Sequence, residues 1–77
     1  MTTEHKIQLK IPALNLVLTP GSRIKLKRFD TTWWTLNHGW YTVSGNRPIC
    51  GWYLVSSDGS ITRSLQLPDL NDIYMVE

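Results

Sequence analysis

The feature that most constrains the fold is a succession of short runs in which apolar and polar residues alternate, each closed by a turn signal. The run from Arg23 to Lys27 alternates without interruption, as in a strand with one face toward a core. Asp58 and Gly59 separate two such runs, and an Asp-Gly pair tolerates the positive φ angles of tight hairpins. Because helical periodicity is nearly absent, the sequence predicts an all-β domain.

The predicted strands of this domain cover residues 23–27, 39–43, 49–55, 61–67 and 73–76. A longer connection occupies residues 29–37. Residues 68–72 are too few for an α-helix but suit one turn of 3₁₀ helix, which Asp69 can cap. The residues expected to be buried together around this corner are Leu67, Leu70, Ile73, Ile24, Leu26 and Val55.

A β-patterned arm precedes these strands. Residues 6–11 alternate, Pro12 confines that run to an edge or ends it, and residues 14–18 resume the pattern. Pro20 and Gly21 then suit the central positions of a type II turn. The chain is therefore divided into an N-terminal arm over residues 1–20 and a barrel over residues 21–77.

Length and composition limit the class of protein. Seventy-seven residues form one small domain, and the single cysteine, Cys50, allows no internal disulfide. Its stability must come from well-buried aromatic residues or from association of subunits. No apolar stretch is long enough for a signal peptide or a membrane span, so we expect a cytoplasmic protein without a membrane partner.

The basic residues are concentrated at one strand. Arg23, Lys25 and Lys27 point to one side of the predicted strand, and Arg28 adds a cation at its end. Such a row can bind phosphates or an acidic partner. It can equally be a solvated face that discourages edge-to-edge aggregation.

The aromatic residues form the second candidate binding feature. Trp33 and Trp34 are adjacent, as are Trp40 and Tyr41, and Trp52 lies in a later strand. Neighbours on a strand face opposite ways, so a small barrel cannot enclose all of these rings. The outward rings are covered by the arm, form a contact between subunits, or make a surface for a partner.

No motif in the chain indicates catalysis. His5, His38 and Cys50 show no zinc-ligand spacing, and no nucleophile elbow, Walker A or dinucleotide-binding pattern is present. We therefore predict no catalytic residues, no metal site and no cofactor.

The strand order, the long first connection, the Asp58-Gly59 hairpin and the 3₁₀-like corner resemble the SH3-like small β-barrel superfamily over residues 21–77. This resemblance implies a five-stranded SH3-like barrel with a 3₁₀ turn before the last strand. The acidic, tyrosine-rich first loop and the Pro-x-Asn-Tyr corner of the proline-recognising branch are not found here.

A narrower resemblance is to the type II dihydrofolate reductases, tetramers of SH3-like chains. Its motifs lie at residues 21–24, 33, 39–41, 51–53 and 64–68. Leu65, Gln66 and Leu67 match three positions of that family's pore-lining run, Pro68 replaces its tyrosine, and Leu26 lies nearest its pore lysine. The resemblance implies a tetrameric enzyme that reduces dihydrofolate with a nicotinamide cofactor.

Together these observations favour a non-enzymatic binding module. Its aromatic surface and basic strand would engage a protein partner, a nucleic acid or another copy of the chain, as in an accessory protein of a mobile element. The alternatives are the reductase-like tetramer and a nucleic-acid-binding SH3-like domain.

Overall fold

The computed structural model describes residues 7–29, 31–43 and 45–77. Lys6 and Ser44, which the sequence-based predictions include, lie outside these residues. The elements, in chain order, are β1 (Leu9–Ile11), the 3₁₀ helix η1 (Pro12–Leu14), β2 (Leu16–Leu18), β3 (Arg23–Leu26), the 3₁₀ helix η2 (Lys27–Phe29), β4 (Trp33–Tyr41), β5 (Ile49–Ser56), β6 (Thr62–Ser64), α1 (Leu67–Asp72) and β7 (Ile73–Val76). The predicted all-β class is confirmed.

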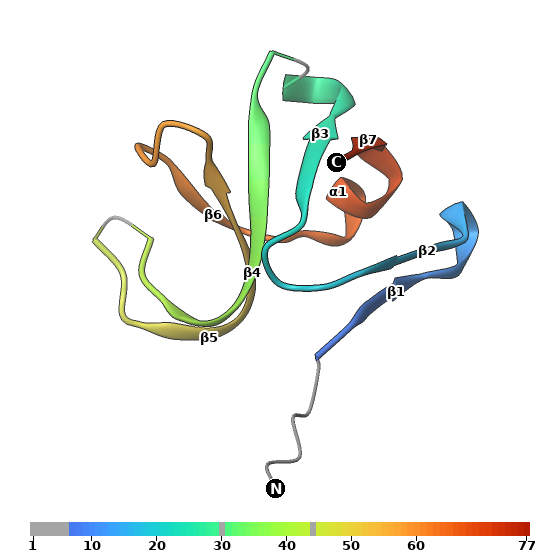
Figure 1. Ribbon diagram of the computed structural model, residues 1–77. Helices are drawn as coiled ribbons and strands as arrows, with labels where there is room; N and C mark the ends of the chain where they lie inside the picture. The colour runs from blue at the N-terminus through green and yellow to red at the C-terminus, as the bar shows by residue number, and fades with distance from the viewer. Residues whose placement is uncertain (1–6, 30, 44) are drawn as a thin grey trace, which may run out of the picture.

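Five strands form one antiparallel sheet in the order β6-β5-β4-β3-β7, and β1 and β2 form a separate hairpin. The last strand thus pairs with β3 rather than with its neighbour in sequence. Figure 1 shows β4 and β5 bending together into a long curved ribbon, while the β1-β2 hairpin extends to the other side, below α1. Successive side chains along each strand of this sheet point to its two opposite faces.

The core lies on one face of this sheet, as the alternation in β3 predicts. Ile24 and Leu26 are fully buried, while Arg23 and Lys25 face the other way. The buried apolar residues are Ile11, Leu18, Ile24, Leu26, Trp34, Leu36, Leu54 and Ile73. Two of them, Ile11 and Leu18, come from the arm, so β1 and β2 supply part of the core.

Several predicted boundaries are wrong. Residues 33–37, which the sequence predicts as part of a connection, begin β4, because Trp34 and Leu36 alternate into the core opposite β3 and β5. The predicted strand 61–67 is only Thr62–Ser64. The strand predicted over residues 23–27 ends at Leu26, and Lys27 belongs to η2.

The corner before the last strand is a six-residue α-helix instead of a 3₁₀ turn. Pro68 lies in its first turn, where a missing N–H is tolerated. The prediction that Leu67 and Val55 are buried is wrong, because Leu67 is 80% exposed and Val55 is half-buried. Leu70 is partly buried and packs against the core. Helical residues advance by about 100° each, so Leu67 lies far around the helix from the buried Asp69.

Two turns follow local chemistry closely. The Ser22 N–H donates to the Thr19 carbonyl at 3.1 Å, and Gly21 has φ +96°, which confirms the type II turn. In the turn between β5 and β6, only Gly59 has a positive φ, of +77°. Asp58 has a different role in that turn, as a hydrogen-bond acceptor.

Candidate functional site

The face of the sheet opposite the core brings Trp33 together with two of the predicted cations. Lys25 lies directly across from Trp33 on β4 and from Met75 on β7. The Lys25 Nζ is 5.1 Å, and the Arg23 Cζ 5.6 Å, from the centroid of the Trp33 ring. Both distances are within the range of cation–π interactions. We call this group of Arg23, Lys25 and Trp33 the cation–tryptophan cluster.

The charges of this cluster are only partly balanced. Arg23 Nη1 forms an ion pair with Glu77 Oε1 at 3.1 Å, and both side chains are well exposed. Lys25 has no ion-pair partner among the residues that the structure describes. The cluster therefore carries a net positive charge beside an aromatic ring.

The same face continues along the curved ribbon to two tyrosines. Tyr41 and Tyr53 are stacked with their ring centroids 4.6 Å apart, and the Tyr41 hydroxyl is hydrogen-bonded to the Ser64 hydroxyl. Between them, Gly39 pairs with Gly51, so no side chain fills the bend there. Tyr41 is thus held against β6, although it belongs to the far end of β4.

The remaining predicted aromatic residues lie elsewhere. Trp34 is 3% exposed and belongs to the core, so it is not a surface residue. Trp52 is partly buried against the core, where its ring contacts that of His38 edge to face. Trp40 is 73% exposed and faces away from Tyr41, because the two are adjacent on one strand. The structure therefore divides the predicted aromatic set between both faces.

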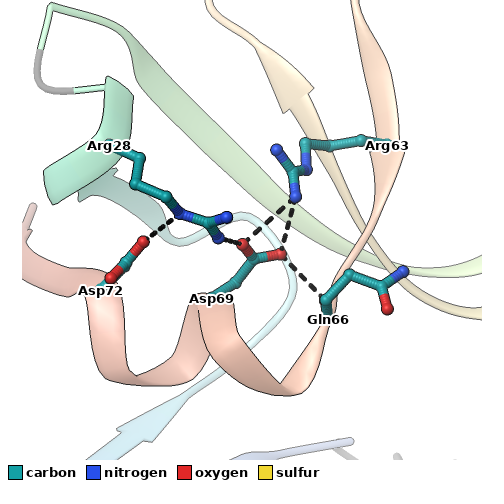
Figure 2. A network of polar contacts seen from close by, with 5 residues as sticks. All are labelled: Arg28, Arg63, Gln66, Asp69 and Asp72. Atoms are coloured by element: carbon teal, nitrogen blue, oxygen red, sulfur yellow. Dashed lines mark hydrogen bonds and ion pairs between the residues drawn. The ribbon is translucent and has the colours of Figure 1, made fainter.

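Arg28, the fourth predicted cation, is turned away from the basic strand toward α1. Figure 2 shows the Asp69 carboxylate between the guanidinium groups of Arg28 and Arg63. Arg28 also bonds to Asp72, while Arg63 Nη2 lies 3.2 Å from both Asp69 oxygens. The Gln66 N–H donates to Asp69 Oδ2 at 2.9 Å, which ties the helix start to the same carboxylate.

Sequence reasoning identified Asp69 only as a helix cap and did not single out Arg63. A carboxylate in the first helical turn signals capping, but nothing local signals that it is fully buried between two arginines. Arg28 and Asp69 are 41 residues apart in the sequence, and Arg63 and Asp69 are 6 apart, so only the fold brings the three side chains together. This four-charge cluster, of Arg28, Arg63, Asp69 and Asp72, fastens α1 to η2 and β6.

A cleft of about 500 Å³ opens next to this charge cluster. It is lined by Phe29, Thr32, Trp34, Val43, Asn46, Ile49, Ile61, Arg63, Ser64 and Gln66. The Arg63 guanidinium lies over the Phe29 ring at 5.2 Å, and Phe29 packs edge to face on Trp34. Two buried donors of the lining residues, Trp34 Nε1 and Arg63 Nε, have no hydrogen-bond partner among the residues that the structure describes.

One turn carries a perturbed carboxylate. Asp58 Oδ1 accepts hydrogen bonds from the Ser56 hydroxyl, the Ser60 hydroxyl and the Ser60 N–H, at 2.7 to 2.9 Å. The Ser56 hydroxyl first, and then the two Ser60 donors, lower the pKa of Asp58 to about 2. The carboxylate is exposed, so we interpret these bonds as fixing the turn between β5 and β6.

The run that resembles the reductase pore lies at the start of α1. β6 ends at Ser64, Leu65 is packed against the core, and Gln66 is the exposed residue that precedes the helix. Leu67 and Pro68 are also exposed. Gln66 thus lines the cleft from the helix side rather than from a strand.

Comparisons with models of protein families, with curated proteins and with solved structures find no match for this chain. Within residues 7–29, 31–43 and 45–77, no helix is long and apolar enough to cross a membrane. The cation–tryptophan cluster and the cleft are therefore the two candidate sites of this chain.

Proposed function

We propose that this chain is a non-enzymatic binding module whose outer sheet face binds a single-stranded nucleic acid. The observation that carries the proposal is the cation–tryptophan cluster, in which one ring and two cations, all half-buried, share the sheet face opposite the core. Single-strand-binding surfaces combine these two elements, since bases stack on aromatic rings while Lys and Arg contact the phosphates.

The charges of the cluster suggest a modest affinity. Lys25 is free of carboxylates in the described part of the chain, and Arg23 shares its charge with an exposed Glu77 that phosphate can displace. Two phosphate contacts correspond to a slope of log K against log salt of about −1.4, since each contact with a single strand contributes about −0.7. Stacking of one base on Trp33 adds about 1 to 3 kcal/mol.

The ring distinguishes this proposal from binding to an acidic protein. A carboxylate-rich partner would use Arg23 and Lys25 but would gain little from the π face of Trp33. A nucleic acid uses both the cations and the Trp33 ring. Whether the ring contributes to the binding affinity therefore distinguishes the two classes of partner.

The test is fluorescence anisotropy of a labelled twelve-residue oligothymidine at several salt concentrations. We expect Trp33→Leu, which keeps an apolar side chain but removes the ring, to weaken binding about 5- to 150-fold. Lys25→Glu should weaken binding and flatten the salt slope by about 0.7 or more. Lys10→Glu, a charge reversal at an exposed position of β1, is the matched control and should change binding little.

Other outcomes are equally informative. Oligothymidine binding that is insensitive to Trp33→Leu, or polyglutamate binding of equal strength, would assign the face to acidic proteins. No binding at low salt would contradict the proposal. Circular dichroism of each variant must first show that the sheet is intact.

A further inference from the structure

β6 is an edge strand of the five-stranded sheet. Among residues 7–29, 31–43 and 45–77 it pairs with β5 alone, with Arg63 opposite Leu54. The hydrogen bonds from Ser56 N–H to the Ile61 carbonyl and from Leu65 N–H to the Trp52 carbonyl flank this pair. By antiparallel alternation, residues 61, 63 and 65 bond to β5, and the backbone N–H and C=O groups of Thr62 and Ser64 point outward from the sheet edge.

The cleft of about 500 Å³ runs along this edge. Arg63 and Ser64 both line it, and consecutive side chains of a strand project to opposite faces. A cleft that is lined by both residues therefore lies beside the strand rather than over one face. Val43, Asn46 and Ile49, at the far end of the β4-β5 ribbon, also line it.

Two buried polar groups of the residues that line the cleft can bond only to hydrogen-bond acceptors. Trp34 Nε1 and Arg63 Nε are donors only, and both are buried without a partner in the described part of the chain. Buried donors in native proteins are normally paired, and leaving one unpaired costs about 1 to 3 kcal/mol. An acceptor that reaches them has to enter through the cleft that their side chains line.

The charge of the surroundings indicates an uncharged occupant. In the four-charge cluster, Arg28 and Arg63 are matched by Asp69 and Asp72, so the guanidinium beside the cleft is already compensated. An additional carboxylate or ammonium would be unpaired there. Half of the lining residues are apolar, and they likewise favour a neutral apolar group; they are Phe29, Trp34, Val43, Ile49 and Ile61.

We propose that the open edge of β6 takes up an extended, uncharged peptide segment of a partner protein as an added strand, with an apolar side chain in the adjoining cleft. The peptide backbone would bond to Thr62 and Ser64, as in other cases of strand addition. Peptide carbonyl oxygens also supply the acceptor type that the Trp34 and Arg63 donors lack. This site is separate from the cation–tryptophan cluster and does not depend on the proposed nucleic-acid function.

The test is selection of a phage-displayed library of random twelve-residue peptides on the immobilised chain, with the Ile49→Arg variant as the competing surface. Ile49 is exposed and lines the cleft, so an arginine there should block it. Val17→Arg, at an exposed position of β2 outside the cleft, is the matched control. We expect enrichment of uncharged peptides with alternating apolar residues, and at least tenfold weaker binding to Ile49→Arg than to Val17→Arg.

The selected peptides then locate the site by amide and indole NMR. Binding should slow the hydrogen exchange of the Thr62 and Ser64 N–H groups and shift the indole N–H signal of Trp34. Peptides carrying N-methyl groups at alternate amides should lose binding. Failure to enrich any peptide over Ile49→Arg, or enriched peptides that leave these three signals unchanged, would overturn the proposal. Selected peptides that are acidic and lost in Lys25→Glu would belong to the outer face instead and would also overturn it.

Discussion

Replacing Asp69 by asparagine tests whether the four-charge cluster holds the corner of the fold. Asp69 is fully buried and receives the guanidinium groups of Arg28 and Arg63 together with the Gln66 N–H. Asparagine keeps the size of the side chain and one acceptor for the backbone N–H, but it removes the charge. The substitution therefore removes the charge and, because the amide nitrogen is a donor, the arginine hydrogen bonds that the second oxygen accepts.

The magnitude follows from the exposure of the two arginines. Losing one partner of a buried ion pair costs about 3 to 5 kcal/mol. Arg28 is 48% exposed and keeps Asp72, so solvent reduces its share. Arg63 is 25% exposed and has no other carboxylate partner among the described residues, so losing its ion pair with Asp69 is not offset by another partner. We expect Asp69→Asn to lower the free energy of unfolding by about 2 to 4 kcal/mol.

The assay is urea unfolding followed by tryptophan fluorescence and circular dichroism. A 77-residue domain has a total stability of roughly 4 to 12 kcal/mol, so the loss is readily measured. Asp72→Asn is the matched control, because Asp72 is partly exposed and, among the described residues, pairs with Arg28 alone; it should cost less than about 1 kcal/mol. If the two variants were equally stable, or Asp69→Asn were within about 0.5 kcal/mol of the native chain, the cluster would not stabilise the corner.

Three further predictions concern the core, the arm and the turn between β5 and β6. Trp34→Ala should cost about 3 to 5 kcal/mol in urea unfolding and Trp40→Ala less than about 0.5, because only the first ring is buried; equal losses would contradict the assignment of faces. Leu18→Ala should cost about 2 to 5 kcal/mol and the neighbouring Val17→Ala less than about 0.5, and a stable Leu18→Ala variant would show that the arm is not part of the core. The lowered pKa of Asp58 means that its ionised form stabilises the fold above pH about 4, and that this contribution disappears as the pH falls through about 2. The difference in unfolding free energy between the native chain and Asp58→Asn should therefore shrink over that interval. A difference that stays constant with pH would refute the assignment.

Much of the framework could be predicted because it depends on local patterns. Alternation placed Ile24 and Leu26 inward and Lys25 outward, since successive side chains on a strand face opposite ways. The Pro20-Gly21 turn could be predicted from the dihedral preferences of those two residues alone. The prediction failed at Trp33 and Trp34, where two adjacent large rings concealed the start of β4.

The candidate sites were less accessible to sequence reasoning. The row of cations was visible, but the sequence did not indicate that Arg28 turns toward Asp69 while Arg23 and Lys25 remain beside Trp33. The cleft was not predicted at all, because its walls come from η2, β6 and the far end of the β4-β5 ribbon. Contacts between such distant segments are set by the curvature and order of the strands.

The sequence by itself determined the all-β class, most of the strands and the inward and outward positions of β3, because backbone geometry imposes a two-residue period wherever a strand forms. Only the tertiary structure decided which tryptophan lies in the core and which cations share the outer face. It also decided that a carboxylate from α1 is buried between arginines of η2 and β6. Burial and ion pairing depend on the elements that pack nearby, and some of these are distant in sequence, as Arg28 is 41 residues from Asp69.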